Sequence, residues 1–299
     1  MKICTLTNCE TDSKSKFLYL IPAGGTDRYC YWAETCQSSI RNIGRYNGDT
    51  LIATDRPDFF TFDNDKTKTK PIDMENTPQC NGSFFMYLKY LALTDYADDN
   101  CNINDYDYII TSDADILWVN NINPLLDFTV KNLKNKIGYF REDISQDRGW
   151  YSTGLKMDKD TFGLSQQGKG GITSGFYICC TSVYKKYMTR WKELTNHLSK
   201  TNSKIRDQHP FNCLIETGEF DAVELPSEYY GIPEYYLKQN MLDRHKEKIN
   251  ANNILHHIVG TSDINVHRRM KPYYFDLLKE NNLPTEPYLY HPPVSYSSN

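Results

Sequence analysis

The sequence lacks several features that would place it in familiar classes of protein. It has no run of about 18 apolar residues, the length that a membrane-spanning helix needs. It has no basic run and its net charge is −4, which argues against sequence-independent binding of nucleic acid. No signal-peptide pattern opens the chain, so we expect a soluble cytoplasmic protein, in the host cytoplasm if a virus encodes it.

The nine cysteines lack the spacing of a metal or disulfide site. Their number is odd and no two form a CxxC pair, so neither structural zinc nor a disulfide framework is supported. We expect reduced and mostly buried thiols. Tyrosine, in contrast, is abundant at 23 residues, and its flat ring and hydroxyl suit carbohydrate recognition as well as core packing.

Short apolar runs alternate with helical patterns along the chain. Strands are expected at 3–7, 50–54, 106–112, 136–140, 172–180 and 222–225, and helices at 28–43, 83–96, from 123 onward, 183–198 and 207–217. Polar stretches at 63–82 and 141–171 predict loops, and the second is long enough to act as a lid or a substrate-binding loop. This order favours a parallel sheet with helices on its faces, in which ligands bind beyond the carboxyl ends of the strands.

The stretch YDYIITSDADILW, 106–118, places Asp113 and Asp115 at the end of an apolar strand. A turn there can bring both carboxylates around one cation. Two hard oxygen ligands suit Mg²⁺ or Mn²⁺, which keep positions open for phosphate oxygens. The plainer interpretation is a pair of solvated loop aspartates, but the flanking apolar runs place the pair inside the sheet, where unpaired charge is costly. The pattern therefore favours a metal site.

A second apolar run, ILHHIVG at 254–260, carries two candidate metal ligands, His256 and His257. An imidazole nitrogen beside two carboxylates is a reasonable ligand set for Mn²⁺. Taken alone, either histidine is more often a satisfied residue of the core or the surface.

Five short motifs then occur in a telling order: TLTN at 5–8, SDAD at 112–115, TSGFYI at 173–178, DQHPFN at 207–212 and HHIVG at 256–260. Together they resemble the nucleotide-sugar glycosyltransferases of the GT-A fold, most of all the retaining families 8 and 77. The resemblance implies an α/β, Rossmann-like domain whose mixed, mostly parallel central sheet is flanked by helices. Within this single compact domain it implies a nucleotide-sugar-binding half at 1–120, an acceptor-binding and catalytic half at 121–285, and a C-terminal tail at 286–299.

The resemblance also assigns roles to single residues. It implies that Asp113, Asp115 and His257 hold Mn²⁺ or Mg²⁺, chiefly through Asp115, and that Asp207 and Gln208 lie beside the reacting sugar carbon as the catalytic pair. Tyr229 is expected near the acceptor. The residues expected around the donor and its metal ion are Leu6, Thr7, Asn8, Asp113, Ala114, Asp115, Glu142, Asp143, Thr173, Ser174, Gly175, His257, Gly260 and Lys271.

The sequence departs from the family 8 pattern where the diphosphate would bind. A Lys-Pro-Trp normally follows the HxxG glycine, whereas here a Lys-Pro-Tyr appears only at 271–273. Arg268, Arg269 and Lys271 are the candidates for the missing clamp. Tyr87 stands where such enzymes often have a donor-binding lysine.

The function implied by the resemblance is metal-dependent transfer of a hexose or pentose from a nucleotide-diphosphate donor, most often UDP-linked, to a glycan or glycoprotein acceptor with retention of configuration. A haloacid-dehalogenase phosphatase is one alternative, although such enzymes carry Thr or Val where Leu117 stands. A non-catalytic carbohydrate-binding protein is another. A sugar nucleotidyltransferase needs a glycine-rich loop after its first strand, whereas AGGT at 23–26 follows a proline.

Overall fold

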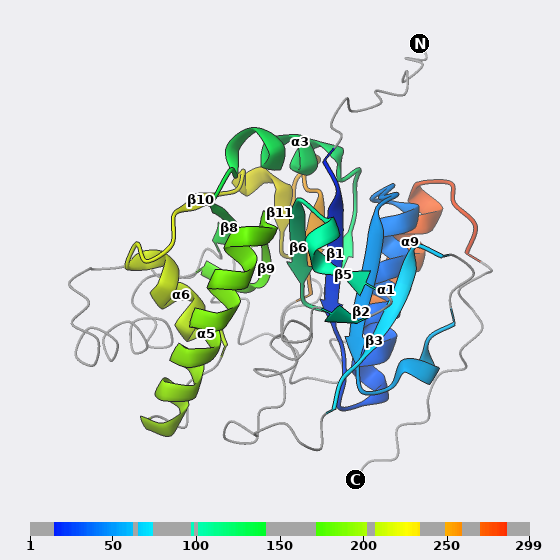
Figure 1. Cartoon of the computed structure of the whole chain (residues 1–299). Helices are drawn as coiled ribbons and strands as arrows, with labels where there is room; N and C mark the ends of the chain where they lie inside the picture. Colours follow the sequence, from blue (N-terminus) through cyan, green and yellow to red (C-terminus); the bar gives the residue numbers. More distant parts are fainter. Residues whose placement is uncertain are drawn as a thin grey trace.

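A central mixed sheet organises the protein, seen in this computed structural model in Figure 1. The structure describes residues 15–61, 65–73, 97–98, 101–141, 172–201, 207–233, 249–258 and 270–285. Within these ranges the sheet contains β1 (Phe17–Pro22), β2 (Asp49–Thr54), β3 (Thr67–Pro71), β6 (Tyr108–Ser112), β8 (Ile137–Arg141), β9 (Ile172–Cys180) and β10 (Ala222–Glu224). Their order across the sheet is β10-β8-β9-β6-β1-β2-β3.

The sheet is parallel over most of its width. β3, β2, β1 and β6 are parallel neighbours, β9 runs antiparallel to both β6 and β8, and β10 is parallel to β8. A second sheet joins β11 (Tyr230–Gly231), β12 (Leu255–His257) and β7 (Ile116–Trp118), and a two-stranded sheet joins β4 (Ala97–Asp98) to β5 (Cys101–Asn102). Single turns of 3₁₀ helix lie at Pro57–Phe59, Ile103–Asp105 and Ser227–Tyr229.

Helices cover both faces of the sheet. They are α1 (Asp27–Asn42), α3 (Asn123–Asn132), α5 (Thr181–Thr201), α6 (Gln208–Glu216) and α9 (Met270–Glu280). The apolar faces of α1 and α9 belong to one core cluster, and those of α5 and α6 belong to another. In Figure 1, α5 and α6 accordingly lie on one side of the sheet and α1 and α9 on the other.

β1 illustrates how the two cores form. Its residues are all buried, and successive side chains point to opposite faces of the sheet. Phe17, Tyr19 and Ile21 enter the core with α1 and α9, whereas Leu18 and Leu20 enter the core with α5 and α6. A strand buried on both faces reads as a continuous apolar run, which is what FLYLIP is.

Many of the predicted elements are confirmed. The predicted helices at 28–43, from 123, at 183–198 and at 207–217 correspond to α1, α3, α5 and α6, and the predicted strands at 50–54, 136–140, 172–180 and 222–225 correspond to β2, β8, β9 and β10. The mostly parallel α/β sheet is confirmed as well. The expected strand at 3–7 and helix at 83–96 lie outside the described residues.

Three expectations need correction. The stretch 63–82 is not wholly loop, because Thr67–Pro71 forms β3 and pairs with β2. β1 and α9 were not predicted at all. The Gly-Gly of AGGT does follow a strand, since Pro22 is the last residue of β1. The argument against a nucleotidyltransferase that rested on that proline is therefore wrong.

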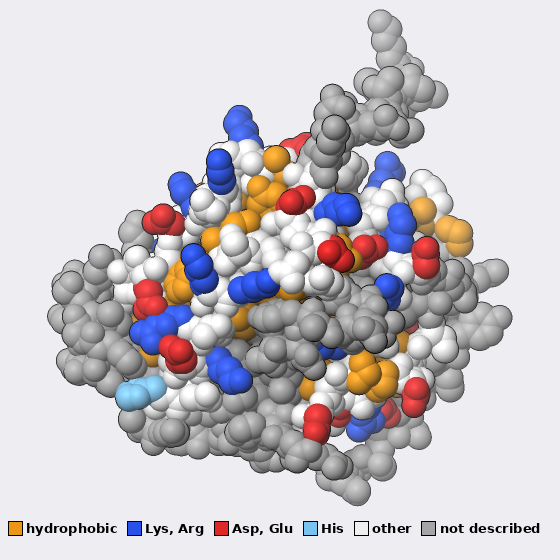
Figure 2. All heavy atoms as spheres, in the orientation of Figure 1, with side chains coloured by type: hydrophobic (Ala, Val, Ile, Leu, Met, Phe, Trp, Pro, Cys, Tyr) orange, Lys and Arg blue, Asp and Glu red, His pale blue; other side chains and the backbone are white. Residues whose placement is uncertain are grey.

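The described cysteines agree with the expectation of reduced thiols. The cysteines whose side chains are described, Cys30, Cys36, Cys179, Cys180 and Cys213, are all free thiols. On the face in Figure 2, basic and acidic side chains are interspersed over the described part of the surface. None of the helices in the described ranges combines the length and the apolar character that crossing a membrane requires.

Candidate metal centre

The Asp-x-Asp turn joins the two larger sheets. β6 ends at Ser112, the chain turns through Asp113 and Asp115, and β7 begins in the second sheet. Backbone hydrogen bonds fix both ends of the turn. The Asp113 N–H donates to the carbonyl of Gly175 at 2.7 Å, and the Asp115 carbonyl accepts from the Ile258 N–H at 2.9 Å. The positions of the two carboxylates are thus set by strand pairing on either side.

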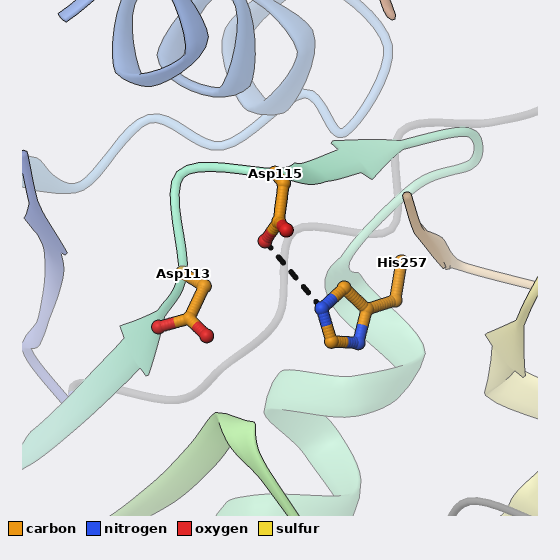
Figure 3. A group of neighbouring side chains, drawn as sticks. All are labelled: Asp113, Asp115 and His257. Carbon is orange, nitrogen blue, oxygen red and sulfur yellow. Dashed lines mark ion pairs between the residues drawn. The ribbon is translucent and has the colours of Figure 1, made fainter. Parts of the chain in front are cut away.

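β12 brings a histidine to this turn. It pairs antiparallel with β7 so that His257 lies opposite Ile116. His257 Nε2 is 3.4 Å from Asp115 Oδ1. Ligand atoms of Asp113, Asp115 and His257 all lie within 4.8 Å of one another, and Figure 3 shows the three side chains converging on one space. The structure therefore brings together the three residues that the sequence proposed as metal ligands.

The residues of this cluster fit a divalent cation. Two carboxylates and an imidazole form a suitable ligand set for Mn²⁺. Asp115 and His257 are buried, with relative exposures of 2% and 6%. Gly175 leaves the space open, because a Cβ there would lie only 2.8 Å from His257 Cε1 and 3.1 Å from Asp113 Oδ2. A side chain at position 175 would press directly on two of the three candidate ligands.

A chain of hydrogen bonds between buried side chains supports the acidic turn. Trp118 Nε1 donates to the Tyr19 hydroxyl at 2.9 Å, Tyr19 OH lies 2.5 Å from Ser112 Oγ, and Ser112 Oγ donates to the Asp113 carbonyl at 3.2 Å. The indole N–H can only donate and the carbonyl can only accept, so Tyr19 donates to Ser112. These hydrogen bonds tie β7, after the turn, to β6, before it, through Tyr19 of β1.

A second group of predicted residues lies where β9 begins. β9 is antiparallel to β6, so its first residues are at the edge where β6 ends. Ser174 Oγ donates to Asp207 Oδ2 at 2.8 Å, and Gln208 Nε2 donates to the Ile172 carbonyl at 3.0 Å. The Trp191 indole donates to the Asp207 carbonyl at 3.0 Å. These bonds hold Asp207 and Gln208 beside the strand that contains Gly175.

The loop that follows β1 was not predicted as part of the site. It reaches the same edge because β1 and β6 are parallel neighbours. Gly25 adopts a φ of +83°, and its N–H donates to Asp55 Oδ1 at 2.9 Å. The signal for this loop was present in the sequence, as the apolar FLYLIP followed by a glycine pair.

The first turn of α1 brings Arg28 against Tyr29. Arg28 Nη2 donates to the Tyr29 hydroxyl at 3.2 Å. Burial raises the pKa of Tyr29, the Arg28 guanidinium opposes this, and the charges of Asp115 and Asp113 raise the pKa further. The phenol of Tyr29 is therefore within electrostatic reach of both carboxylates.

His256 is not part of the cluster. Its Nδ1 lies 2.7 Å from the Tyr273 hydroxyl, and its Nε2 lies 3.2 Å from Asn253 Oδ1. Burial lowers the pKa of His256 to about 4. Both ring nitrogens are thus engaged on the opposite face of β12 from His257.

Of the remaining residues predicted for the site, some are described by the structure and others lie outside its described part. Ala114 is buried within the turn, Thr173 is buried on β9, and Tyr229 is half-buried. Lys271 is the second residue of α9, with its ammonium 5.9 Å from the Phe275 ring centroid. Residues outside the described part of the chain are Leu6, Thr7, Asn8, Tyr87, Glu142, Asp143, Gly260, Arg268 and Arg269.

This architecture, with the acidic turn at the carboxyl edge of a mixed sheet, is that of the GT-A glycosyltransferases. The galactosyltransferase LgtC, solved in complex with donor and acceptor sugar analogs, superimposes with a TM-score of 0.56 at 13% identity, over 90% of this chain and 98% of that one. Mouse xyloside xylosyltransferase 1 in its apo form gives a TM-score of 0.52 at 12% identity, over 83% and 99%. No family model and no curated protein matches the sequence. The predicted GT-A fold is confirmed.

Proposed function

We propose that the protein is a metal-dependent glycosyltransferase that moves a sugar from a nucleotide-diphosphate donor, UDP foremost, to a hydroxyl of a glycan or glycoprotein, with retention of configuration. One observation carries the proposal: Asp113, Asp115 and His257 converge at the carboxyl edge of a GT-A sheet. In open α/β sheets this edge is where ligands bind.

The acidic turn and His257 would hold the cation. A bound Mn²⁺ or Mg²⁺ offsets the negative charge that develops on the departing diphosphate. The two carboxylates balance a doubly charged ion by themselves, so the diphosphate calls for further positive charge. We assign this charge to Arg28, which donates to the Tyr29 hydroxyl. Burial raises the pKa of that same tyrosine, and the charges of Asp115 and Asp113 raise it further. Arg268, Arg269 and Lys271 remain the candidates from the sequence.

The start of β9 would hold the donor sugar. Thr173 and Ser174 come directly before Gly175 in β9. The Ser174 hydroxyl donates to the carboxylate of Asp207 and orients it. Gln208 is oriented by its bond to the Ile172 carbonyl. We assign Asp207 and Gln208 to the face of the sugar from which the acceptor attacks, where they stabilise positive charge on the reacting carbon. Such positioning can lower the barrier by several kcal/mol.

Calorimetry with UDP tests the proposal most directly. We expect UDP to bind in the presence of Mn²⁺ and to bind much more weakly in EDTA. A screen of UDP-hexoses and UDP-pentoses for slow Mn²⁺-dependent hydrolysis then identifies the donor. Binding of free sugars with no effect of nucleotide would favour a non-catalytic carbohydrate-binding protein. Phosphate release from a generic phosphomonoester would favour the phosphatase alternative, which the GT-A fold does not support.

A further inference from the structure

We propose that Tyr230 is a positioning residue for the metal ligand His257. Its hydroxyl holds the imidazole through Nδ1, so that Nε2 faces the space between Asp113 and Asp115. The inference rests on the proposed metal site and assigns a role to a residue that contacts neither the ion nor the substrate.

The contact between Tyr230 and His257 is short and buried, and packing holds the tyrosine ring in place. The Tyr230 hydroxyl lies 2.7 Å from His257 Nδ1. Both side chains are buried, with relative exposures of 1% and 6%. The Tyr230 ring stacks on Phe140, with centroids 5.1 Å apart and an angle of 24° between the planes. The hydroxyl therefore has a fixed location from which it can fix the imidazole.

The pairing of β11 with β12 brings Tyr230 close to His257. β11 pairs in parallel with β12, with Tyr230 opposite Leu255. The backbone N–H of Ile254 donates to the Tyr229 carbonyl at 2.8 Å. The ring of Tyr230 thus approaches His257 from the neighbouring strand, on the side away from Asp115.

A hydroxyl is suited to this contact because it can both donate and accept. When Nε2 gives its lone pair to a cation, Nδ1 must carry the imidazole proton and donate it to the Tyr230 oxygen. When no cation is bound, Tyr230 can donate to Nδ1 while Nε2–H faces Asp115 Oδ1 at 3.4 Å. Metal-ligating histidines almost always donate their second ring N–H to such a partner, which fixes the ring and raises its basicity.

The adjacent histidine provides a matched control within the same strand. Tyr273 lies 2.7 Å from His256 Nδ1, the same distance as in the Tyr230 pair. Nε2 of His256 meets Asn253 Oδ1 at 3.2 Å rather than an acidic turn. Removing either hydroxyl deletes one Tyr–His hydrogen bond, which is buried for Tyr230 and partly buried for Tyr273. Only the Tyr230 bond leads to a candidate ligand.

The experiment compares Tyr230→Phe with Tyr273→Phe in the full-length protein. Mn²⁺ affinity is measured by titration calorimetry or by the EPR signal of free Mn²⁺, and thermal unfolding is measured in EDTA. We expect Tyr230→Phe to weaken Mn²⁺ binding by about 10- to 100-fold, and Tyr273→Phe to change it by less than about twofold. Unfolding temperatures in EDTA should fall for both variants, because each loses one hydrogen bond of the same length.

A double-mutant cycle separates positioning from a general loss of structure. In a His257→Ala background, Tyr230→Phe should cause no further loss of Mn²⁺ affinity, because the hydroxyl acts only through the imidazole. Equal weakening by both Phe variants would overturn the inference, as would an undiminished effect of Tyr230→Phe without His257. Wild-type affinity in Tyr230→Phe would overturn it while leaving the proposed function intact. A wild-type protein that binds no Mn²⁺ would refute the metal site and this inference together.

Discussion

The two faces of β12 present the same side-chain chemistry and lead to different roles. His256 and His257 are neighbours, and each has a tyrosine hydroxyl 2.7 Å from Nδ1. His257 directs Nε2 toward Asp115, whereas His256 directs Nε2 toward Asn253. What the second ring nitrogen meets therefore separates a candidate metal ligand from a structural histidine.

Each histidine also has its own glycine. A Cβ at Gly175 would lie 2.8 Å from His257 Cε1, and a Cβ at Gly231 would lie 2.5 Å from His256 Cδ2. The same close approach thus serves two purposes. Gly175 keeps open the space between the candidate metal ligands, whereas Gly231 lets the His256 ring pack tightly.

The largest expected effect comes from replacing Asp115, a candidate metal ligand. Asp115→Ala should lower Mn²⁺-dependent turnover of the donor by about 10³-fold, because metal stabilisation of the leaving group supplies several kcal/mol. Circular dichroism and thermal unfolding in EDTA should be close to wild type, since the substitution removes a buried charge. Turnover by the purified variant at the wild-type rate would refute the metal assignment.

Replacing each histidine by glutamine in turn tests the comparison between the two residues. His257→Gln should raise the Kd for Mn²⁺ by roughly 100-fold, because it removes a ligand rather than the ligand's partner. His256→Gln should leave that Kd within about threefold and lower the free energy of unfolding by about 1–3 kcal/mol, through loss of buried hydrogen bonds. Mn²⁺ titration and urea unfolding on both variants measure the two effects. The reverse pattern would mean that the ligand is His256.

The glycines should divide in the same way, with smaller effects. Gly175→Ala should weaken Mn²⁺ binding by about tenfold, because the added methyl pushes on His257 and Asp113. Gly231→Ala should leave Mn²⁺ affinity near wild type and destabilise the fold by about 1–3 kcal/mol through overpacking. If Gly175→Ala bound Mn²⁺ normally, the ligands would be less constrained than the structure implies.

The smallest effect concerns pH. Burial lowers the pKa of His256 to about 4 from its ordinary 6.5, so between these values the unfolded chain binds more protons and stability rises with pH. As pH falls through this window, we expect the metal-free protein to lose on the order of 3 kcal/mol of stability from this residue. Urea unfolding between pH 4 and 7 measures it. The His256→Gln variant should show a correspondingly shallower dependence, and an unchanged slope would contradict the assignment.

Much of the fold could be predicted because the periodic elements are long and well bounded. Helix α1 repeats buried Cys30, Ala33, Cys36 and Ile40 along one face, and β9 was predicted with its exact bounds. β1 was missed because a fully buried strand shows no alternation, and its run ends in a proline. β3 was missed because TKTKP reads as a polar loop, yet pairing with β2 supplies the backbone hydrogen bonds that make it a strand.

The sequence by itself determined that two carboxylates follow a buried strand, because apolar runs flank Asp113 and Asp115 on both sides. Only the tertiary structure decided which histidine joins them. Consecutive residues of a strand point to opposite faces, and the face that meets the acidic turn depends on how β12 pairs with β7. The sequence holds no record of that pairing, because residues 117 and 256 meet only when the chain has folded.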